Sequence, residues 1–236
     1  MREAVILAGG FGTRLRHIVS DVPKPMAPVC GRPFLCYLLD VLADSGFGHV
    51  VLSTGYMHEK IESYFGTEYH GLTLDYACET APLGTGGGML NALQHCFSDD
   101  VLVLNGDTLF LIDYDALYRY HSDHDARLTV VLRQVDDVAR YGAVVCNGEG
   151  RITSFVEKNA SQGAGLINGG IYLMNRTILD AFKVGDKFSF ENDVLQALYP
   201  EQTFMGFADN GYFIDIGVPE DYARAQRDFA SFSSKM

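Results

Sequence analysis

Short apolar runs and amphipathic stretches alternate along the first half of the chain. Residues 4–7 are continuously apolar, which is typical of a strand buried on both faces of a parallel sheet. The strands expected in this half are 4–7, 50–53, 72–77 and 101–104, and the expected helices are 34–44, 57–64 and 89–96. Strands separated by helices in this way predict a parallel, doubly wound sheet.

The second half mixes the two patterns less regularly. Strand patterns cover 128–133, 152–156 and 166–174, and helix patterns cover 113–122 and 220–229. Ser189 is predicted to cap a helix that runs to Leu198, and this capping explains the charges of Glu191 and Asp193. Asp215 stands between two isoleucines in a further strand-like run, where a carboxylate is costly unless it is paired or binds a metal ion.

A glycine-rich turn follows the first strand and contains Gly9, Gly10, Gly12, Thr13 and Arg14. Glycines after a buried strand let backbone N–H groups approach a ligand, and successive N–H groups form an anion-binding concavity. The arginine adds donors suited to phosphate, so the turn predicts a phosphate cradle. It lacks the Lys-Ser or Lys-Thr of a P-loop and the third glycine of a dinucleotide fingerprint. A turn without a ligand remains the alternative.

A second glycine-rich turn, residues 79–88, follows the third strand and precedes an apolar helix. Gly86 and Gly87 are predicted to bring backbone and a helix N-terminus close to a ligand. Ligands of doubly wound sheets bind outside the carboxyl ends of the strands, and two glycine loops at this edge are more specific than one. Lys24, held between two prolines in an extended segment, is equally consistent with a phosphate contact and with a solvated charge.

Polar residues at the ends of later strands complete the candidates. Asp107 ends the fourth strand, where either Mg²⁺ binding or an Asx turn explains a carboxylate. Glu157 and Lys158 form a pair of a kind that is usually solvated. The two glycines after Asn168 indicate the close approach of a ligand or a β-bulge.

Composition narrows the class of protein. A net charge of −12 argues against nucleic acid as a partner, and an acidic chain that binds phosphate needs local cations, for which a divalent metal is economical. No run approaches the length of a membrane span, and no signal peptide is visible, so no membrane partner is expected. Five cysteines without a C-x-x-C pair indicate reduced thiols and a cytoplasmic location.

As a set, these motifs resemble those of the sugar-1-phosphate nucleotidyltransferases, or NDP-sugar pyrophosphorylases. The matching pieces follow the family's order over nearly the whole chain: LAGGFGTRL at 7–15, VPKPM at 22–26, ETAPLGTGG at 79–87, NGD at 105–107, VEK at 156–158, NGGIY at 168–172, FSFENDVL at 188–195 and FIDIGVPEDY at 213–222. Each piece is weak alone, but the set is specific.

The resemblance implies a single domain over residues 1–236, without the appended C-terminal β-helix domain of some relatives. Its fold would be α/β, a Rossmann-like, GT-A-like three-layer sandwich with a mostly parallel mixed central sheet. Its reaction would join a nucleoside triphosphate to a sugar 1-phosphate with Mg²⁺ and release pyrophosphate. The nucleophile is already ionised, so positioning and charge neutralisation suffice for catalysis. A homodimer is compatible with this resemblance.

The resemblance also implies roles for individual residues. The catalytic residues would be Arg14, Lys24, Asp107 and Lys158, and Mg²⁺ would be held by Asp107 and Asp215. The nucleotide would be bound by Leu7, Gly9, Gly10, Gly12, Thr13, Arg14, Glu79, Gly84, Thr85 and Gly86. The sugar phosphate would be bound by Gly142, Glu157, Lys158, Asn168 and Gly169.

Within the family, RLRHIVSDVPKPMAPVCGRPF and PLGTGGG look most like sequences of the D-glycero-D-manno-heptose 1-phosphate guanylyltransferases. Arg16 and His17 replace the usual proline, and Leu83-Gly84-Thr85 stands where thymidylyltransferases typically carry a glutamine-containing loop, which favours GTP over dTTP. One alternative is the same chemistry on mannose or another hexose 1-phosphate with GTP, UTP or CTP. Others are a non-catalytic nucleotide-sugar-binding regulatory protein and an NAD-binding oxidoreductase, the latter disfavoured by the missing third glycine.

Overall fold

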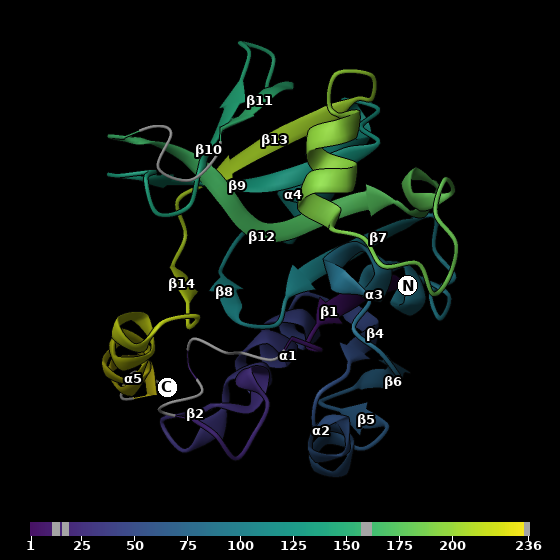
Figure 1. The fold of residues 1–236 in the computed structure, drawn as a ribbon. Helices are drawn as coiled ribbons and strands as arrows, with labels where there is room; N and C mark the ends of the chain where they lie inside the picture. Colours follow the sequence, from purple (N-terminus) through teal and green to yellow (C-terminus); the bar gives the residue numbers. More distant parts are fainter. Residues whose placement is uncertain (11–14, 16–18, 157–161, 234–236) are drawn as a thin grey trace.

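A computed structural model of the chain describes residues 1–10, 15, 19–156 and 162–233. Its centre is an eight-stranded sheet in the order β13-β9-β12-β7-β1-β4-β6-β5 (Figure 1). The four parallel strands in the middle and on one side are β1 (Arg2–Leu7), β4 (Phe47–Thr54), β6 (Leu72–Cys78) and β7 (Asp100–Asn105). The continuous apolar runs of the sequence therefore do form a buried parallel core.

The order of the strands creates a switch point beside β1. Through α1 (Phe34–Asp44) and α2 (His58–Phe65) the chain adds β4 and then β6 on one side, and α3 (Gly84–Leu93) returns it to β7 on the other side. Leu7 at the end of β1 lies opposite both Ser53 and Asn105. The carboxyl ends of these strands thus meet at one edge, which is where ligands bind in such sheets.

The remaining strands make the sheet mixed. β12 (Gly165–Asn175) runs antiparallel between β7 and β9 (Leu128–Val135), and β13 (Phe204–Asp209) is parallel to β9. The other strands are short: β5 (Glu68–Tyr69) on the sheet edge, the pairs β10 (Ala143–Cys146) with β11 (Ile152–Val156), β8 (Thr108–Phe110) with β14 (Phe213–Asp215), and β2 (Pro28–Val29) with β3 (Arg32–Pro33). The mostly parallel mixed sheet that the resemblance implied is confirmed.

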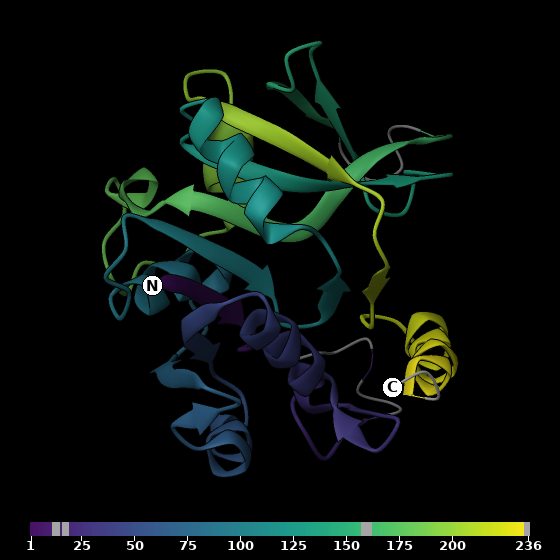
Figure 2. The same cartoon turned by 180° about the vertical axis from the view of Figure 1, so that it is seen from behind.

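Alternate residues of β1 enter two separate cores. Ala4 and Ile6 belong to the core that α1, α2, α4 (Tyr114–Asp123) and α5 (Pro219–Ser233) cover. Val5 belongs to the core of α3 and η3 (Phe190–Gln196). Helices α1 and α4 lie on the face of the sheet that is turned to the viewer in Figure 2. The segment η3 lies on the opposite face, which is turned to the viewer in Figure 1. Helices on both faces complete the expected three layers.

The expected elements are present, and three of them differ in detail. Helix α3 begins at Gly84, whereas the sequence predicted a start at Met89. The proline-rich segment contains a turn of 3₁₀ helix, η1 (Lys24–Met26), because the fixed φ of Pro25 suits such a turn as well as an extended chain. The helix capped by Ser189 is a π-helix, η3, in place of the expected α-helix.

The amino end of β1 carries a buried carboxylate. Glu3 is 3% exposed, its Oε1 lies 2.8 Å from Nδ1 of His49, and its Oε2 accepts the N–H groups of Phe97 (2.9 Å) and Ser98 (2.5 Å). Burial alone would raise the pKa of Glu3, but these hydrogen bonds outweigh it and lower the pKa to about 2. Glu3 therefore ties β1 to β4 and to the loop before β7.

Because the pKa of Glu3 falls from 4.5 to about 2 on folding, the ionised side chain stabilises the fold above about pH 4.5, and this contribution is lost as the pH falls towards 2. Glu3→Gln should lower the free energy of unfolding at pH 7 by about 1–3 kcal/mol, and the difference from the wild type should narrow below pH 4. Urea denaturation at pH 7 and below pH 4 measures the free energy of unfolding of both proteins. Asp75→Asn, which changes the half-exposed second partner of His49, is the control and should have little effect. A difference that does not depend on pH would contradict the assignment.

Candidate active site

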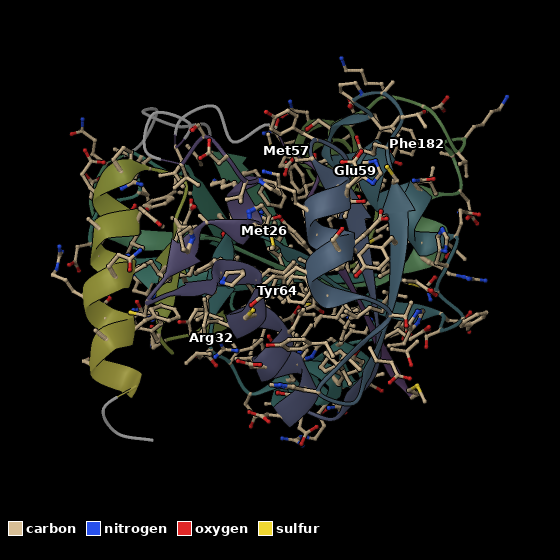
Figure 3. The ribbon with its side chains drawn as sticks, turned by 90° about the horizontal axis from the view of Figure 1, so that it is seen from below. Met26, Arg32, Met57, Glu59, Tyr64 and Phe182 are labelled. Atoms are coloured by element: carbon tan, nitrogen blue, oxygen red, sulfur yellow. The ribbon has the colours of Figure 1, made fainter. Side chains whose placement is uncertain are left out.

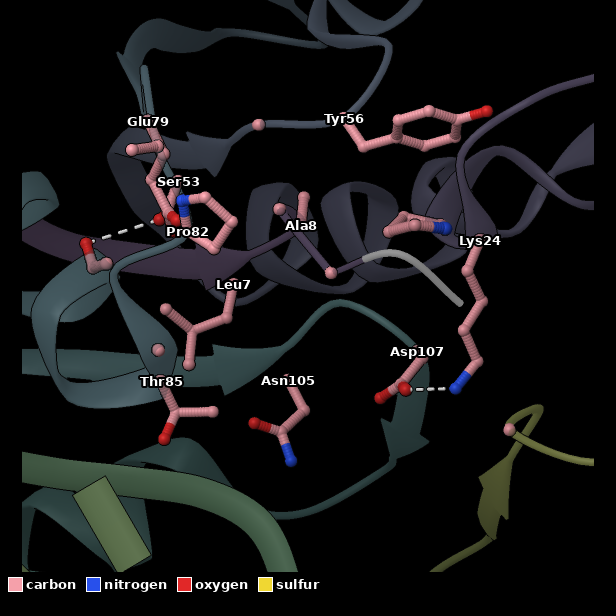
Figure 4. Close-up of a pocket in the computed structure, with 18 of the residues that line it drawn as sticks. Leu7, Ala8, Lys24, Ser53, Tyr56, Glu79, Pro82, Thr85, Asn105 and Asp107 are labelled. Carbon is pink, nitrogen blue, oxygen red and sulfur yellow. Dashed lines mark hydrogen bonds and ion pairs between the residues drawn. The ribbon is translucent and has the colours of Figure 1, made fainter. Parts of the chain in front are cut away.

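A pocket of about 640 Å³ opens outside the carboxyl ends of β1, β4, β6 and β7 (Figure 4). It therefore lies at the switch point of the sheet. Several residues that the sequence singled out line it, namely Leu7, Gly9, Gly10, Lys24, Glu79, Gly84, Thr85 and Asp107. The two glycine-rich turns and the NGD motif, separated by up to 100 residues, thus face one cavity.

The first glycine turn packs closely where it leaves β1 and is open one residue later. A Cβ atom added to Gly9 would lie 3.3 Å from both Oε1 of Glu79 and the carbonyl carbon of Thr54, so this position is tight. A Cβ on Gly10 would meet no atom within 4 Å. The predicted cradle continues through Gly12, Thr13 and Arg14, which lie outside the described residues.

Two carboxylates and a lysine converge at the other end of the pocket. Lys24 is 12% exposed, and its Nζ forms an ion pair with Oδ2 of Asp107 (Figure 4). Asp215 ends β14, which pairs with β8, the strand that follows Asp107. A Cβ on Gly217 would lie 2.7 Å from Oδ1 of Asp215 and 2.9 Å from Nζ of Lys24. Lys24 is therefore the local cation between Asp107 and the Asp215 region.

The backbone of Lys24 is fixed by its neighbours. Pro25 and Met26 are buried, the N–H of Met26 donates to the carbonyl of Pro23 (2.8 Å), and that of Ala27 donates to the carbonyl of Lys24 (3.0 Å). Figure 3 shows Met26 in the region between α5 and α2. The side chain of Lys24 thus reaches into the pocket from an ordered turn, which decides against the solvated loop charge that the sequence left open.

Asp107 and Asp215 fit a magnesium site that a substrate would complete. Mg²⁺ is commonly held by one or two carboxylates together with water and substrate phosphates. Among the described residues, no group of three or more His, Cys, Asp and Glu side chains is arranged to hold a metal ion. Asp107 in the pocket wall and Asp215 beside Gly217 therefore suit Mg²⁺ better than a metal that needs a full set of protein ligands.

The glycines of the second loop pack against residues 186–188. A Cβ would lie 2.5 Å from the carbonyl oxygen of Phe188 at Gly84 and 2.3 Å from that of Asp186 at Gly87. At Gly86 it would lie 2.2 Å from the Phe188 ring, and the N–H of Gly86 already donates to the Phe188 carbonyl (3.1 Å). The close approach that the sequence predicted is thus made to protein rather than to a ligand, and a nucleotide contact of Gly86 stays a prediction.

Glu79 holds the entrance of this loop. Its Oε2 accepts the N–H of Leu83 (3.0 Å), and its Oε1 lies against Gly9 and Gly88, both in the wall of the pocket. Burial raises the pKa of Glu79, and the hydrogen bond from Leu83 opposes this rise. A partly buried carboxylate oxygen is therefore available at the pocket to a ligand with N–H donors.

Strand β12 has an irregular register at its glycines, where the sequence left a β-bulge open as one alternative. Its register with β9 shifts between Asn168 and Tyr172. The Asn168 amide donates to the hydroxyl of Tyr172 (2.8 Å) and accepts the N–H of Gly170 (2.9 Å). A Cβ on Gly169 would lie 2.7 Å from the ring of Phe110. The glycines are thus explained by packing, and sugar contacts of Asn168 and Gly169 stay predictions.

Of the other predicted sugar residues, the structure describes Gly142. Gly142 closes a turn by donating its N–H to the carbonyl of Val138 (2.9 Å), with a φ of 81° that favours glycine. Glu157 and Lys158 lie outside the described residues.

The pocket is also lined by residues that the sequence analysis did not assign to the site, among them Tyr56, Asn105 and Glu191. Tyr56 follows β4 and Asn105 ends β7, so both stand at the carboxyl ends of parallel strands. That position was the available signal for them. Glu191 carried no such signal, because helix capping already explained its charge.

The sequence pattern of the Nucleotidyl transferase family matches residues 3–231. The chain belongs to this family. It is 44% identical over 230 residues to the D-glycero-alpha-D-manno-heptose 1-phosphate guanylyltransferase of Aneurinibacillus thermoaerophilus, covering 98% of this chain and 99% of that protein. It is 41% identical over 220 residues to the protein of the same name from Campylobacter jejuni, covering 93% and 96%.

Solved structures agree with this family assignment. HddC from Yersinia pseudotuberculosis superimposes with a TM-score of 0.86 at 39% identity, over 97% of this nucleotidyltransferase and 100% of HddC. A second HddC structure, complexed with GMP-PN, gives a TM-score of 0.84. The expected fold and the expected class of enzyme, a nucleotidyltransferase, are confirmed, and the oxidoreductase alternative is wrong.

The packing of the second glycine loop can be tested at Gly87, inside helix α3. Alanine in a helix interior normally stabilises by about 0.5–1 kcal/mol relative to glycine. Here the Cβ would lie 2.3 Å from a backbone oxygen, so Gly87→Ala should instead lower the melting temperature. Thermal unfolding measures whether the melting temperature of Gly87→Ala falls or rises relative to the wild type. Gly148→Ala, whose Cβ meets no atom within 4 Å, should change it little. A higher melting temperature for Gly87→Ala would rule out the close contact.

Proposed function

We propose that this nucleotidyltransferase transfers the guanylyl group of GTP to D-glycero-D-manno-heptose 1-phosphate, giving GDP-heptose and pyrophosphate. The observation that carries the proposal is the pocket at the switch point, with Lys24 and Asp107 at one end and Glu79 at the other. Similarity over nearly the full length to two heptose 1-phosphate guanylyltransferases supports this choice of substrates.

Glu79 supports guanine as the base. The N1–H and the amino group of guanine are neighbouring donors, and a carboxylate can accept from both. Adenine presents an acceptor, its N1, on the corresponding edge and would leave Oε1 of the partly buried Glu79 without this donor. An unpaired buried polar group is a strong basis for rejecting the wrong substrate. The neighbour HddC was crystallised with GMP-PN, which agrees with a guanine site in this fold.

The chemistry is an in-line displacement at the α-phosphorus of GTP. A phosphate oxygen of the sugar phosphate forms the new bond, and the bond to pyrophosphate breaks with its electron pair on the leaving group. The nucleophile is ionised at neutral pH, so no residue must accept a proton. Lys24 would stand beside the reacting phosphorus and offset the repulsion between the two anions. Arg14 and Lys158, outside the described residues, would add two further cations.

The proposal includes Mg²⁺, held by Asp107 and Asp215. Bound there, the ion would neutralise charge on the triphosphate and on the departing pyrophosphate.

In the part of the chain that the structure describes, no helix is both long and apolar enough to cross a membrane. A homodimer and a cytoplasmic location stay predictions.

The direct test is pyrophosphate release with Mg²⁺, crossing GTP, ATP, UTP, CTP and dTTP against heptose, mannose and glucose 1-phosphates. We expect release with GTP and the heptose phosphate, and none after the metal is removed with EDTA. Release with another pair would keep the mechanism and correct the substrates. No release from folded protein that still binds nucleotide would favour a non-catalytic regulatory protein.

Lys24→Ala should lower kcat by at least ~10²-fold, because it removes a fixed positive charge from the site of the reaction. Steady-state kinetics measures this loss of kcat. The melting temperature of Lys24→Ala checks that the fold stays intact when Asp107 has lost its ion-pair partner. Lys183→Ala, a lysine substitution away from the pocket, is the control and should keep full activity. A loss of only a few-fold would show that Lys24 mainly pairs with Asp107.

A further inference from the structure

Glu191 joins the two sides of the pocket. It is the second residue of η3, and it lines the cavity. Its Oε2 accepts hydrogen bonds from the hydroxyls of Thr85 (2.6 Å) and Ser189 (3.0 Å). The Thr85 hydroxyl in turn accepts the N–H of Phe190 (2.9 Å). The carboxylate of Glu191 is thus held in one orientation between the second glycine-rich turn and η3.

Helix capping accounts for only part of the contacts of Glu191. Oδ2 of Asp193 accepts the N–H of Ser189 (2.7 Å), and the Ser189 hydroxyl accepts the N–H of Asn192 (3.2 Å). Glu191 lies in the first turn of the helix, as expected, but its carboxylate accepts from the side chains of Ser189 and Thr85. The π-helix itself is a rare form that occurs frequently at functional sites.

Glu191 is linked to the predicted sugar residue Asn168 through Phe190 and Tyr172. The ring of Phe190, the residue before Glu191, packs on the ring of Tyr172 with 5.0 Å between the centroids. Burial is the main cause of the raised pKa of the Tyr172 hydroxyl, and the negative charge of Glu191 raises it further. Tyr172 holds the amide of Asn168 (2.8 Å). Among the described residues, the hydrogen bonds that reach the Glu191 carboxylate all end on Oε2. Its Oε1 is the oxygen left for a ligand.

We propose that Glu191 determines sugar specificity by accepting a hydrogen bond from a ring hydroxyl of the sugar 1-phosphate through Oε1. This inference rests on the proposed function. Both substrates are anions, so a carboxylate in the pocket is tolerable only where it meets hydrogen-bond donors. The hydroxyls of the sugar would be such donors, and a charged acceptor binds them more strongly than a neutral one.

The orientation of the carboxylate is what makes it selective. In Figure 4 the Thr85 hydroxyl points away from the Glu79 side of the pocket, and this hydroxyl donates to Oε2 of Glu191. With Oε2 fixed by Thr85 and Ser189, Oε1 is also held in one place, so it can accept only from hydroxyls that reach that place. Glu191 would thus distinguish sugars that differ in those hydroxyls.

Glu191→Gln tests the proposal with little change of shape. The amide oxygen can still accept from Thr85 and Ser189, whereas an NH₂ group replaces the acceptor Oε1. We expect KM for the sugar phosphate to rise about 10- to 100-fold, as for loss of a hydrogen bond to a charged group, while KM for GTP and the melting temperature change little. Asp193→Asn is the matched control, because it weakens the cap of the same helix and should leave KM for the sugar phosphate unchanged.

Monodeoxy analogues of the sugar phosphate at C2, C3 and C4 identify the hydroxyl. One analogue should lose about 10- to 100-fold in kcat/KM with the wild type and lose little more with Glu191→Gln, because both changes remove the same hydrogen bond. Additive losses with every analogue, unchanged kinetics of Glu191→Gln, or a rise in KM confined to GTP would overturn the proposal, the last by pointing to the ribose. A wild-type protein that uses no sugar phosphate would overturn the proposed function together with this inference.

Discussion

The central position of β1 is the constraint on which the rest of the site depends. Its hydrogen bonds to β4 on one side and β7 on the other place Leu7 opposite both Ser53 and Asn105. Both faces of β1 are buried, so a shift of register would break two cores at once. The order and register of these strands therefore fix where the loops after them meet. The pocket is a consequence of the order in which the chain adds strands.

Packing of the second glycine loop extends this constraint to the other half of the chain. Gly84, Gly86 and Gly87 allow residues 186–188 to lie against α3 with backbone contacts that any side chain would prevent. The same contact brings η3 beside the second glycine-rich turn, where the Thr85 hydroxyl donates to Glu191. A glycine run that reads as a ligand loop is therefore also the joint between the parallel half of the sheet and the C-terminal segments that line the pocket.

Most of the fold could be predicted from the sequence, because the apolar runs of β1, β4, β6 and β7 have no other way to be buried. Asp107 and Lys24 could be identified as candidates from a strand end and from the prolines around a lysine. What could not be predicted were contacts between distant segments. The start of α3 at Gly84 depends on Phe188, and the position of Glu191 depends on Thr85, about 100 residues away. Local propensity contains no information on either contact.

The charges in the pocket follow from what two anionic substrates permit. Glu79, Asp107 and Glu191 all line it, and each carboxylate accepts a donor from the protein: an N–H of Leu83, the ammonium of Lys24 and the hydroxyls of Thr85 and Ser189, respectively. Each donor fixes the orientation of its carboxylate, and the second oxygen of that carboxylate is then available to a cation or to a donor on a ligand. In Asp107 this second oxygen, Oδ1, also accepts a hydrogen bond from the Thr108 hydroxyl (3.2 Å). Under the proposed function, these carboxylates would repel phosphates wherever no cation stands between them. The open backbone beside Gly10 and the ammonium of Lys24 would attract phosphates, so the negative groups of an acidic protein would help to place negative substrates.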